Sequence, residues 1–411
     1  MKKYIVLFLL FGLWGCLANR IDDDLKKPEK ETFVNVPEDF TWTPILQKMV
    51  RVDITSGGAK TNALNNTLIE MYNEEGEFLD ALTILNGTAE FNLRVPSATT
   101  GLKLVVPATE KELDITPDQT TVAFDVPNIS ASNFERLDLD EDGLYDQFDA
   151  DPNNPNLTVK VERGSRLKSA AGKKSTTSNY TIFEDLWPAK GDYDFNDLVV
   201  KTTYSWERGK GNYIEEISGV CNVEWIGAGL ELGLGFELFE SNGTKLVYHN
   251  DIIKAIDNAE KDPEVTNGII IFSRVQEKGT GEIEFNISLK DKQIKDFVCI
   301  PYLFRTNDPK HQVRPFGAPP TENQDMVMFR TLNDASPVTW DREKEEKFKY
   351  PLTGKDAFYR SAENHPWGIE FMAKSFRPVK EKVSIIKGYP KFREWAESGG
   401  KKEKDWYEHP N

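Results

Sequence analysis

The feature that most constrains the fold is a recurring pattern of short segments in which apolar and polar residues alternate. Examples are "KMVRVDIT" (48–55), "AEFNLRVP" (89–96) and "GEIEFNISL" (281–289). A period of two is typical of half-buried β-strands, and the Gly, Asn and Pro between such segments favour turns. We therefore predict a mainly β chain, with a small sandwich over residues 45–128 and a larger, jelly-roll-like sandwich over residues 180–411.

The N-terminus carries an export signal. In "MKKYIVLFLLFGLWGC" two lysines precede an apolar run that is too short to span a bilayer, and Gly15 stands directly before Cys16. This arrangement resembles a bacterial lipobox, which implies cleavage after Gly15 and attachment of lipid to Cys16. The alternative is an ordinary signal peptide with a chance cysteine. We predict a signal peptide over residues 1–15, a flexible tether over residues 16–44, and an outer-membrane lipoprotein exposed at the cell surface.

Composition excludes several classes of function. The chain has 411 residues and a net charge of −16, which argues against binding to nucleic acid or, by charge alone, to an anionic membrane. Its four histidines form no H-E-x-x-H pair, and no nucleophile elbow, phosphate loop or dinucleotide fingerprint occurs. We predict no catalysis and interpret the histidines as surface residues. For Cys221 and Cys299, which lie in apolar segments, a disulfide and two buried free thiols are equally open.

Residues 129–155 are predicted to bind calcium. In "LDLDEDGLYDQFDADP" (137–152), oxygen-bearing groups stand at loop positions 1, 3, 5, 7, 9 and 12, with Gly143 at position 6. That is the spacing of a calcium loop, in which glycine makes the sharp turn. Two carboxylates about 5 Å apart repel by roughly 1 kcal/mol in water, so this many would not converge without a cation. The predicted ligands are Asp138, Asp140, Asp142, Leu144 through its carbonyl, Asp146, Asp149 and Asp151.

The alternative for this stretch is a solvated acidic linker. Its pattern D-x-D-x-D-G-x-x-D-x-x-D also resembles a thrombospondin type 3-like repeat. The resemblance favours calcium, and we expect the bound ion to stiffen a joint between the two sandwiches. Residues 156–179 are rich in Ser, Lys and Gly and are predicted to form a linker.

A second acidic stretch, "FEDLWPAKGDYDFNDLVV" (183–200), leads into an apolar strand. Three interpretations stay open, namely a calcium site, a turn in which Asp and Asn satisfy backbone donors, and an acid/base pair for glycoside hydrolysis. The stretch lacks the glycine and the final carboxylate of a complete loop, so some ligands would come from elsewhere, such as Glu184 or Asp185. The metal ligands predicted here are Asp192, Asp194, Asn196 and Asp197.

The same stretch resembles the opening signature of the LruC-type domain, which occurs in surface lipoproteins of Bacteroidetes. Further matching segments follow in the order "GAPPT" (317–321), "LNDAS" (332–336), "ENHPWGIEF" (363–371), "KVSIIKGYPKFREWAESGG" (382–400) and "DWY" (405–407). The resemblance covers roughly residues 180–409 and departs from the family at Asn333, where another acid is usual. It implies a lipobox and an upstream acidic repeat, as here, and it implies no activity.

Two tryptophans are candidates for ligand contact. Trp187 and Trp367 each stand beside a proline in a loop-like segment, although tryptophans of β-sandwiches more often belong to the core. We therefore expect a calcium-binding surface protein whose β-sandwich head recognises or adheres to an extracellular glycan or protein. The alternatives are a structural subunit of a surface assembly, joined through strand edges, and a carbohydrate-active enzyme that uses carboxylates.

Overall fold

A computed structural model describes residues 33–126, 134–162, 177–241, 243–246, 253–255, 259–279, 281–290, 292–331, 352 and 356–411. Cys16, the signal peptide and most of the predicted tether lie outside these residues, as do residues 163–176 and 332–351. The chain forms two compact units, Met1–Asn35 and Val36–Asn411, and the elements given below all belong to the second. Among the described residues, no helix has the length and apolar character needed to cross a membrane.

Strands dominate the described residues, which confirms the prediction of a mainly β chain. The strands are β1 (Ile45–Ser56), β2 (Ala59–Lys60), β3 (Leu68–Asn73), β4 (Phe78–Thr83), β5 (Thr88–Pro96), β6 (Leu102–Val106), β7 (Lys111–Ile115), β8 (Thr121–Asp125), β9 (Val159–Glu162), β10 (Ser178–Phe183), β11 (Leu198–Arg208), β12 (Ile214–Ile226), β13 (Leu232–Phe239), β14 (Ile253–Ala255), β15 (Glu260–Lys261), β16 (Gly268–Phe272), β17 (Glu282–Ser288), β18 (Val298–Arg305), β19 (Asp308–Val313) and β20 (Gly368–Ala373). The helices are η1 (Pro107–Thr109), η2 (Lys210–Asn212), α2 (Val275–Lys278), α3 (Met328–Thr331), α4 (Ile385–Gly388), α5 (Pro390–Glu397) and η5 (Trp406–Glu408).

The smaller sandwich is formed by two four-stranded sheets. One has the order β2-β1-β5, with β8 paired in parallel to β1, and the other has the order β4-β3-β6-β7. Alternate residues of β5 point inward, so Phe91 and Leu93 join Val52 of β1 and Leu104 of β6 in one core. The period-two pattern of the sequence therefore corresponds directly to the buried face of β5, β6 and β8, whereas β4 is buried at every position.

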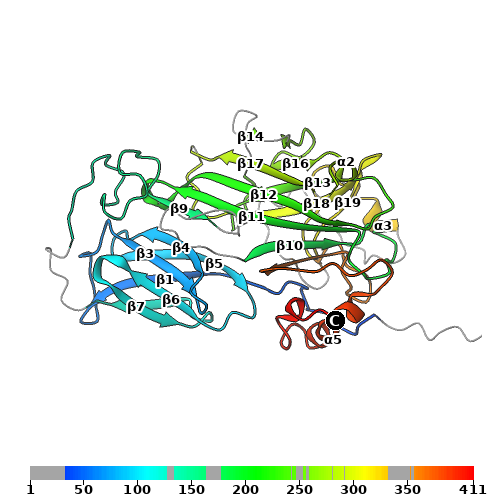
Figure 1. Ribbon diagram of the computed structural model, residues 1–411, viewed down its shortest axis with the longest axis horizontal. Helices are drawn as coiled ribbons and strands as arrows, with labels where there is room; N and C mark the ends of the chain where they lie inside the picture. The colour runs from blue at the N-terminus through cyan, green and yellow to red at the C-terminus, as the bar shows by residue number, and fades with distance from the viewer. Residues whose placement is uncertain are drawn as a thin grey trace, which may run out of the picture. The chain divides into compact units, whose positions relative to one another are not determined.

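The larger sandwich packs a seven-stranded sheet against a five-stranded sheet (Figure 1). The first has the order β14-β17-β12-β11-β10-β20, with β9 also paired to β11, and the second has the order β15-β16-β13-β18-β19. Every pairing in these two sheets is antiparallel. The presence of two sandwiches confirms the predicted fold class.

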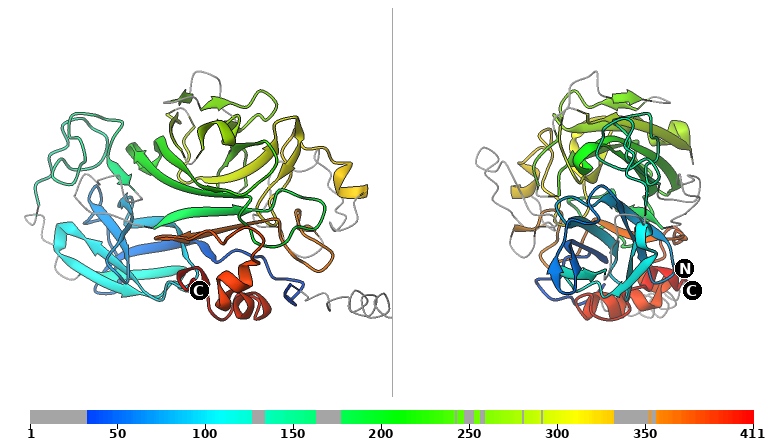
Figure 2. Two further views of the ribbon diagram at one scale, coloured as in Figure 1. Left: turned by 45° about the vertical axis from the view of Figure 1, so that its right-hand side comes forward. Right: turned by 90° about the vertical axis from the view of Figure 1, so that its left-hand side faces the viewer.

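A helical cap covers the outer face of β10 and β20 (Figure 2). Helix α5 buries Phe392, Trp395 and Ala396, whose spacing places them on one face of a helix, and Pro390 begins it. Trp406 of η5 lies 4.8 Å from Phe392 between ring centroids and packs on the sheet beneath. The cap is thus held by aromatic contacts, which bury large apolar areas.

The two sandwiches share a core. Phe78 of β4, from the smaller sandwich, belongs to the core cluster of the larger one. Two ion pairs also join the sandwiches: Arg208 of β11 donates to Asp80 of β4 at 2.9 Å, and Arg94 of β5 donates to Glu370 of β20 at 2.6 Å. These buried contacts make the second compact unit one body.

The predicted tether (residues 16–44) and the predicted linker (residues 156–179) each contain residues that belong to the folded body. Trp42, at the end of the predicted tether, is buried and packs 5.8 Å from Trp395 of α5 between ring centroids. Within the predicted linker of residues 156–179, β9 pairs with β11. Polarity suggested loops in both places, but the apolar residues at these ends find partners distant in sequence.

Candidate cation sites

Alternate aspartates of the acidic loop converge. One carboxylate oxygen from each of Asp138, Asp140 and Asp142 lies within 4.8 Å of the others. The backbone turns to bring them together, because Gly143 has φ 94° and its N–H donates to Asp138 at 3.1 Å. The N–H of Leu144 similarly donates to Asp142 at 2.8 Å. This is the turn that the glycine at position 6 predicted.

Each of these aspartates, and Asp149 as well, has one oxygen without a hydrogen-bond donor. One buried oxygen of each of Asp138, Asp140, Asp142 and Asp149 has no partner, and Asp142 as a whole is only 2% exposed. Burial, reinforced by repulsion from Asp140, raises the pKa of Asp142 to about 6 and that of Asp149 to about 7. Because unpartnered buried carboxylates are costly, this donor set fits a divalent cation.

Asp146 and Asp151 have no buried, unpartnered oxygen of this kind, and the carbonyl of Leu144 stays a predicted ligand. Asp146 accepts the N–H of Leu139 at 2.8 Å, and Asp151 donates its own N–H to Asp149 at 2.9 Å. The side chain of Leu144 is fully buried in the core of the larger sandwich. The structure therefore brings together the aspartates of positions 1, 3 and 5, and the charges of Asp142 and Asp140 act on the aspartate of position 12, Asp149. The side chain of Asp146 braces the backbone of the loop.

The loop is fastened to both sandwiches. Leu144 enters the larger core, whereas Tyr145 packs against the smaller core beside Phe134. Lys210, in the connection between β11 and β12, donates to the carbonyl of Glu141 at 2.9 Å. An ion in this loop would thus be held by a segment that is anchored at several points.

A second cluster lies at the start of β11. Oxygens of Glu184, Asp192 and Asp194 lie within 4.8 Å of one another. Glu184 is only 1% exposed, and burial raises its pKa well above the usual range. Burial also raises the pKa of Asp194 to about 6.

The other residues predicted for this cluster have structural partners. Asp197 accepts the N–H of Asp185 at 2.7 Å, and burial raises the pKa of Asp197 to about 7. Asn196 donates from its side chain to the carbonyl of Val379 at 2.9 Å, while its side-chain oxygen is buried without a partner. The cluster is therefore centred on Glu184 with Asp192 and Asp194, and Asp197 supports the turn.

The two tryptophans proposed as ligand contacts are core residues, so that prediction was wrong. Trp187 is 0% exposed and packs against Phe329 and Tyr359, with ring centroids 4.8 and 5.2 Å away. Trp367 is 1% exposed, and its indole N–H donates to the carbonyl of Ala189 at 2.8 Å. The loops that carry them fold back over the end of the sheet, which their sequence did not reveal.

Two of the histidines and both described cysteines are buried. His311 and His365 are buried, and His365 contacts the Tyr193 hydroxyl at 3.2 Å, so their assignment to the surface was wrong. Cys221 and Cys299 are both free and buried, which settles the open question in favour of thiols.

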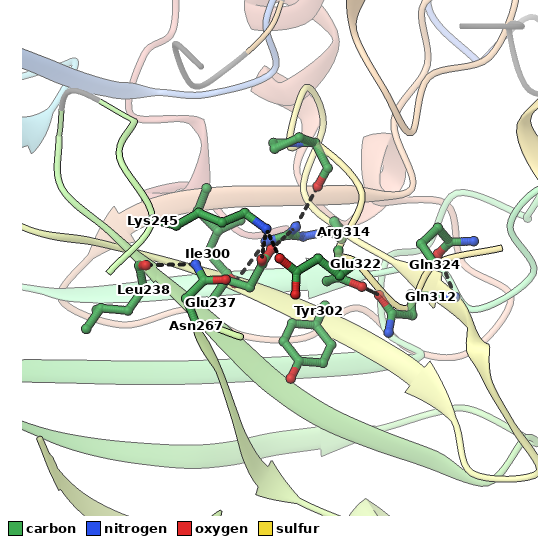
Figure 3. A network of polar contacts seen from close by, with 12 residues as sticks. Glu237, Leu238, Lys245, Asn267, Ile300, Tyr302, Gln312, Arg314, Glu322 and Gln324 are labelled. Carbon is green, nitrogen blue, oxygen red and sulfur yellow. Dashed lines mark hydrogen bonds and ion pairs between the residues drawn. The ribbon is translucent and has the colours of Figure 1, made fainter. Parts of the chain in front are cut away.

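A buried ion pair was missed by the sequence analysis (Figure 3). Arg314 and Glu237 are paired with almost no exposure of either side chain, and Lys245 links Glu237 to Glu322. Arg314 also donates to the carbonyl of Ile300 at 3.3 Å. The available signal was Glu237 itself, because a single charge inside the apolar run "LGLGFELF" of β13 demands a buried partner.

The geometry thus defines a double β-sandwich protein with two carboxylate clusters that fit divalent cations. Residues 212–407 match the model of a family described as a domain of unknown function (DUF4842). That span includes most of the larger sandwich and its cap but neither carboxylate cluster. No curated protein matches the chain.

Three solved structures are distantly similar. A "putative lipoprotein" from Bacteroides ovatus is 14% identical over 84% of this chain and 98% of that one, with a TM-score of 0.39. The RrgB pilus protein of Streptococcus pneumoniae (11% identical, TM-score 0.13) and the Bacillus anthracis TIE protein (10%, 0.14) align with 65% and 63% of this chain. The chain spans about half the length of these last two, covering 48% and 45% of them. TM-scores this low do not establish a shared fold.

Proposed function

We propose that this chain is a lipid-anchored, calcium-binding surface protein of a bacterium, with a rigid β-sandwich head that serves recognition or adhesion. The observation that carries the calcium assignment is the set of four buried, unpartnered carboxylate oxygens in residues 138–149. The anchor rests on the lipobox-like segment that ends at Cys16, which lies outside the described residues. The LruC-type and thrombospondin type 3-like resemblances support the same surface location.

Calcium suits the loop better than magnesium. Calcium accepts six to eight oxygen ligands in flexible geometry, whereas magnesium demands a near-ideal octahedron and keeps several waters. The loop supplies only oxygen, from carboxylates and backbone. Sites of this kind in extracellular modules often bind with a Kd of about 10⁻⁴ to 10⁻³ M, which matches millimolar calcium outside the cell.

The shared core of the sandwiches changes the role that we assign to the ion. Because Phe78 and the Asp80–Arg208 pair already join the two sandwiches, calcium is not needed to stiffen a hinge between them. Instead, the ion holds residues 138–149 in a compact turn against that body and relieves repulsion among buried carboxylates. The head would then present one fixed surface to its partner.

The test uses the soluble chain from residue 17 onward, which keeps the whole second compact unit. At about 10 mM calcium, a Kd of 10⁻⁴ to 10⁻³ M stabilises the folded state by about 1.4 to 2.7 kcal/mol relative to chelator. Asp140→Asn with Asp142→Asn should remove calcium binding at the loop, as measured by calorimetry, and most of this stabilisation. Asp114→Asn, an exposed aspartate outside both clusters, is the matched control. Retention of the same calcium uptake by the double variant would refute the loop assignment.

The recognition part of the proposal needs a different aromatic residue. With Trp187 and Trp367 buried, Trp225 of β12 is the candidate for stacking on a sugar, since it is 40% exposed. On a glycan array, Trp225→Ala should lose signals that the parent chain gives in calcium. Unchanged binding by this variant would remove Trp225 from the recognition surface.

A further inference from the structure

We infer that Glu184, Asp192 and Asp194 hold a second divalent cation, which locks the C-terminal helical cap onto the larger sandwich. This site goes beyond the proposed function, because it is built from other residues than the loop of residues 138–149. The lock acts through residues 379–385, which we call the strap, since they connect the sheet to α4 and α5.

The first support is a buried carboxylate without a compensating charge. Within the described part of the chain, the only donor to the Glu184 side chain is the N–H of Phe195, which binds Oε1 at 2.7 Å. No described lysine, arginine or histidine is paired with Glu184, Asp192 or Asp194. No described group donates to Oε2 of Glu184, and one oxygen of Glu184 lies within 4.8 Å of oxygens of both Asp192 and Asp194. A carboxylate that is buried without a counter-charge either binds a proton or needs a cation to compensate its charge.

The second support is the backbone that brings the carboxylates together. A Cβ atom at Gly191 would stand 1.8 Å from Oε2 of Glu184, so only glycine lets this carboxylate approach the turn. Tyr193 and Phe195 have φ of 58° and 51°, a region that aromatic residues rarely adopt. Strain of this kind persists where the surroundings fix the chain, and it often marks functional sites.

The simpler interpretation, a structural turn, explains only part of the cluster. It accounts for Asp194, which accepts the N–H groups of Asn196 at 3.2 Å and Lys382 at 2.8 Å. It also accounts for Oε1 of Glu184, which accepts the N–H of Phe195, but it leaves Oε2 without a donor. Nor does it explain why Asp192 lies near both carboxylates without a hydrogen-bond donor among the described residues. A cation accounts for all three carboxylates, and oxygen ligands alone favour calcium.

The cluster is connected directly to the strap. Besides the Lys382–Asp194 bond, the side chain of Asn196 donates to the carbonyl of Val379 at 2.9 Å, and the N–H of Ile385 donates to the carbonyl of Tyr193 at 2.8 Å. These contacts join the turn at residues 193–196 to the segment that leads into the cap. A cation that fixes the turn therefore also favours docking of the cap.

The test separates the two sites with isosteric variants of the soluble chain. Asp192→Asn is the central variant. Asp192 is exposed and accepts no hydrogen bond from a described group, so the variant should fold like the parent chain. In calorimetric titration with calcium, we expect two ions per parent chain and one for Asp192→Asn. The Asp140→Asn, Asp142→Asn double variant should also bind one, and the combined triple variant none. Asp114→Asn should bind two.

Hydrogen exchange gives a second readout that reports on the cap. Calcium should slow exchange in peptides covering residues 379–398 at least severalfold in the parent chain and in the loop double variant. The Asp192→Asn variant should show no such slowing. The inference would be overturned if Asp192→Asn still bound two calcium ions. It would also be overturned if calcium did not change the rate of hydrogen exchange of the strap in the parent chain. Because the loop variants are measured separately, failure of this site and failure of the loop site give different results.

Discussion

Removing the charge of Asp80 should destabilise the whole head, because Asp80 neutralises a buried guanidinium between the sandwiches. Arg208 donates to Asp80 at 2.9 Å, and their side chains are only 4% and 8% exposed. In Asp80→Asn, Arg208 would keep its charge and its bonds to the carbonyls of Asn212 and Lys295, at 3.0 and 2.9 Å, but would lose its counter-charge. Breaking one side of a buried pair costs about 3 to 5 kcal/mol, so we expect a loss within that range.

The measurement is urea unfolding of the soluble chain in calcium, followed by tryptophan fluorescence. The control is Glu112→Gln, which breaks an exposed pair with Lys103 and should cost about 0 to 1 kcal/mol. Replacing both partners, Asp80→Leu with Arg208→Met, should recover much of the loss, because no charge is then left buried. The reasoning would be refuted if Asp80→Asn cost no more than Glu112→Gln, or if the sandwiches unfolded in two separate transitions.

Three further outcomes follow from single side chains. Gly143→Ala meets no neighbour within 4 Å, so its effect is the backbone cost of φ 94°, about 1 to 2 kcal/mol, and calorimetry should show calcium affinity about tenfold weaker. Burial lowers the pKa of His311 below its usual value of 6.5, so stability should be complete above pH 6.5 and fall as pH drops towards the folded-state pKa. Melting curves of His311→Gln should lack this loss, and an equal loss would contradict the assignment. Burial raises the pKa of Cys221 and Cys299 to about 12, so a thiol reagent should modify neither in the native state and both in denaturant.

The features that sequence predicted well are local. In β1 and β5 each strand alternates, so the buried face can be read from a few consecutive residues. The turn of the acidic loop is equally local, because its converging aspartates and its turning residue, Gly143, fall within six positions. Convergence of Asp138, Asp140 and Asp142 needs only the backbone between them, and the structure brings their oxygens within 4.8 Å.

The second cluster shows why the spacing of acidic residues was not enough to predict which side chains lie together. The spacing pointed to Asp197, but its oxygens are not among those that lie within 4.8 Å of one another, and it accepts the N–H of Asp185. Glu184 is the third member of that group. Because β10 and β11 are adjacent antiparallel strands with Phe183 opposite Leu198, Glu184 lies beside the segment that leads into β11. Strand pairing is a long-range property, and the sequence offered Glu184 only as one of two possible additions.

The wrong prediction for Trp187 and Trp367 has the same cause, namely strand pairing between segments that are distant in sequence. Phe183 of β10 pairs with Gly368 of β20, so the loop carrying Trp187 leaves the sheet where the residue before Gly368, Trp367, enters it. The two indoles therefore lie at one end of neighbouring strands, and Phe329 covers Trp187 there. Proline beside tryptophan signalled an irregular backbone, but irregular backbone is not the same as an exposed loop. Where segments pack over the end of a sandwich, a large aromatic residue in such a segment fills the core, and the proposed stacking on a ligand would depend on a side chain such as Trp225 that the packing leaves exposed.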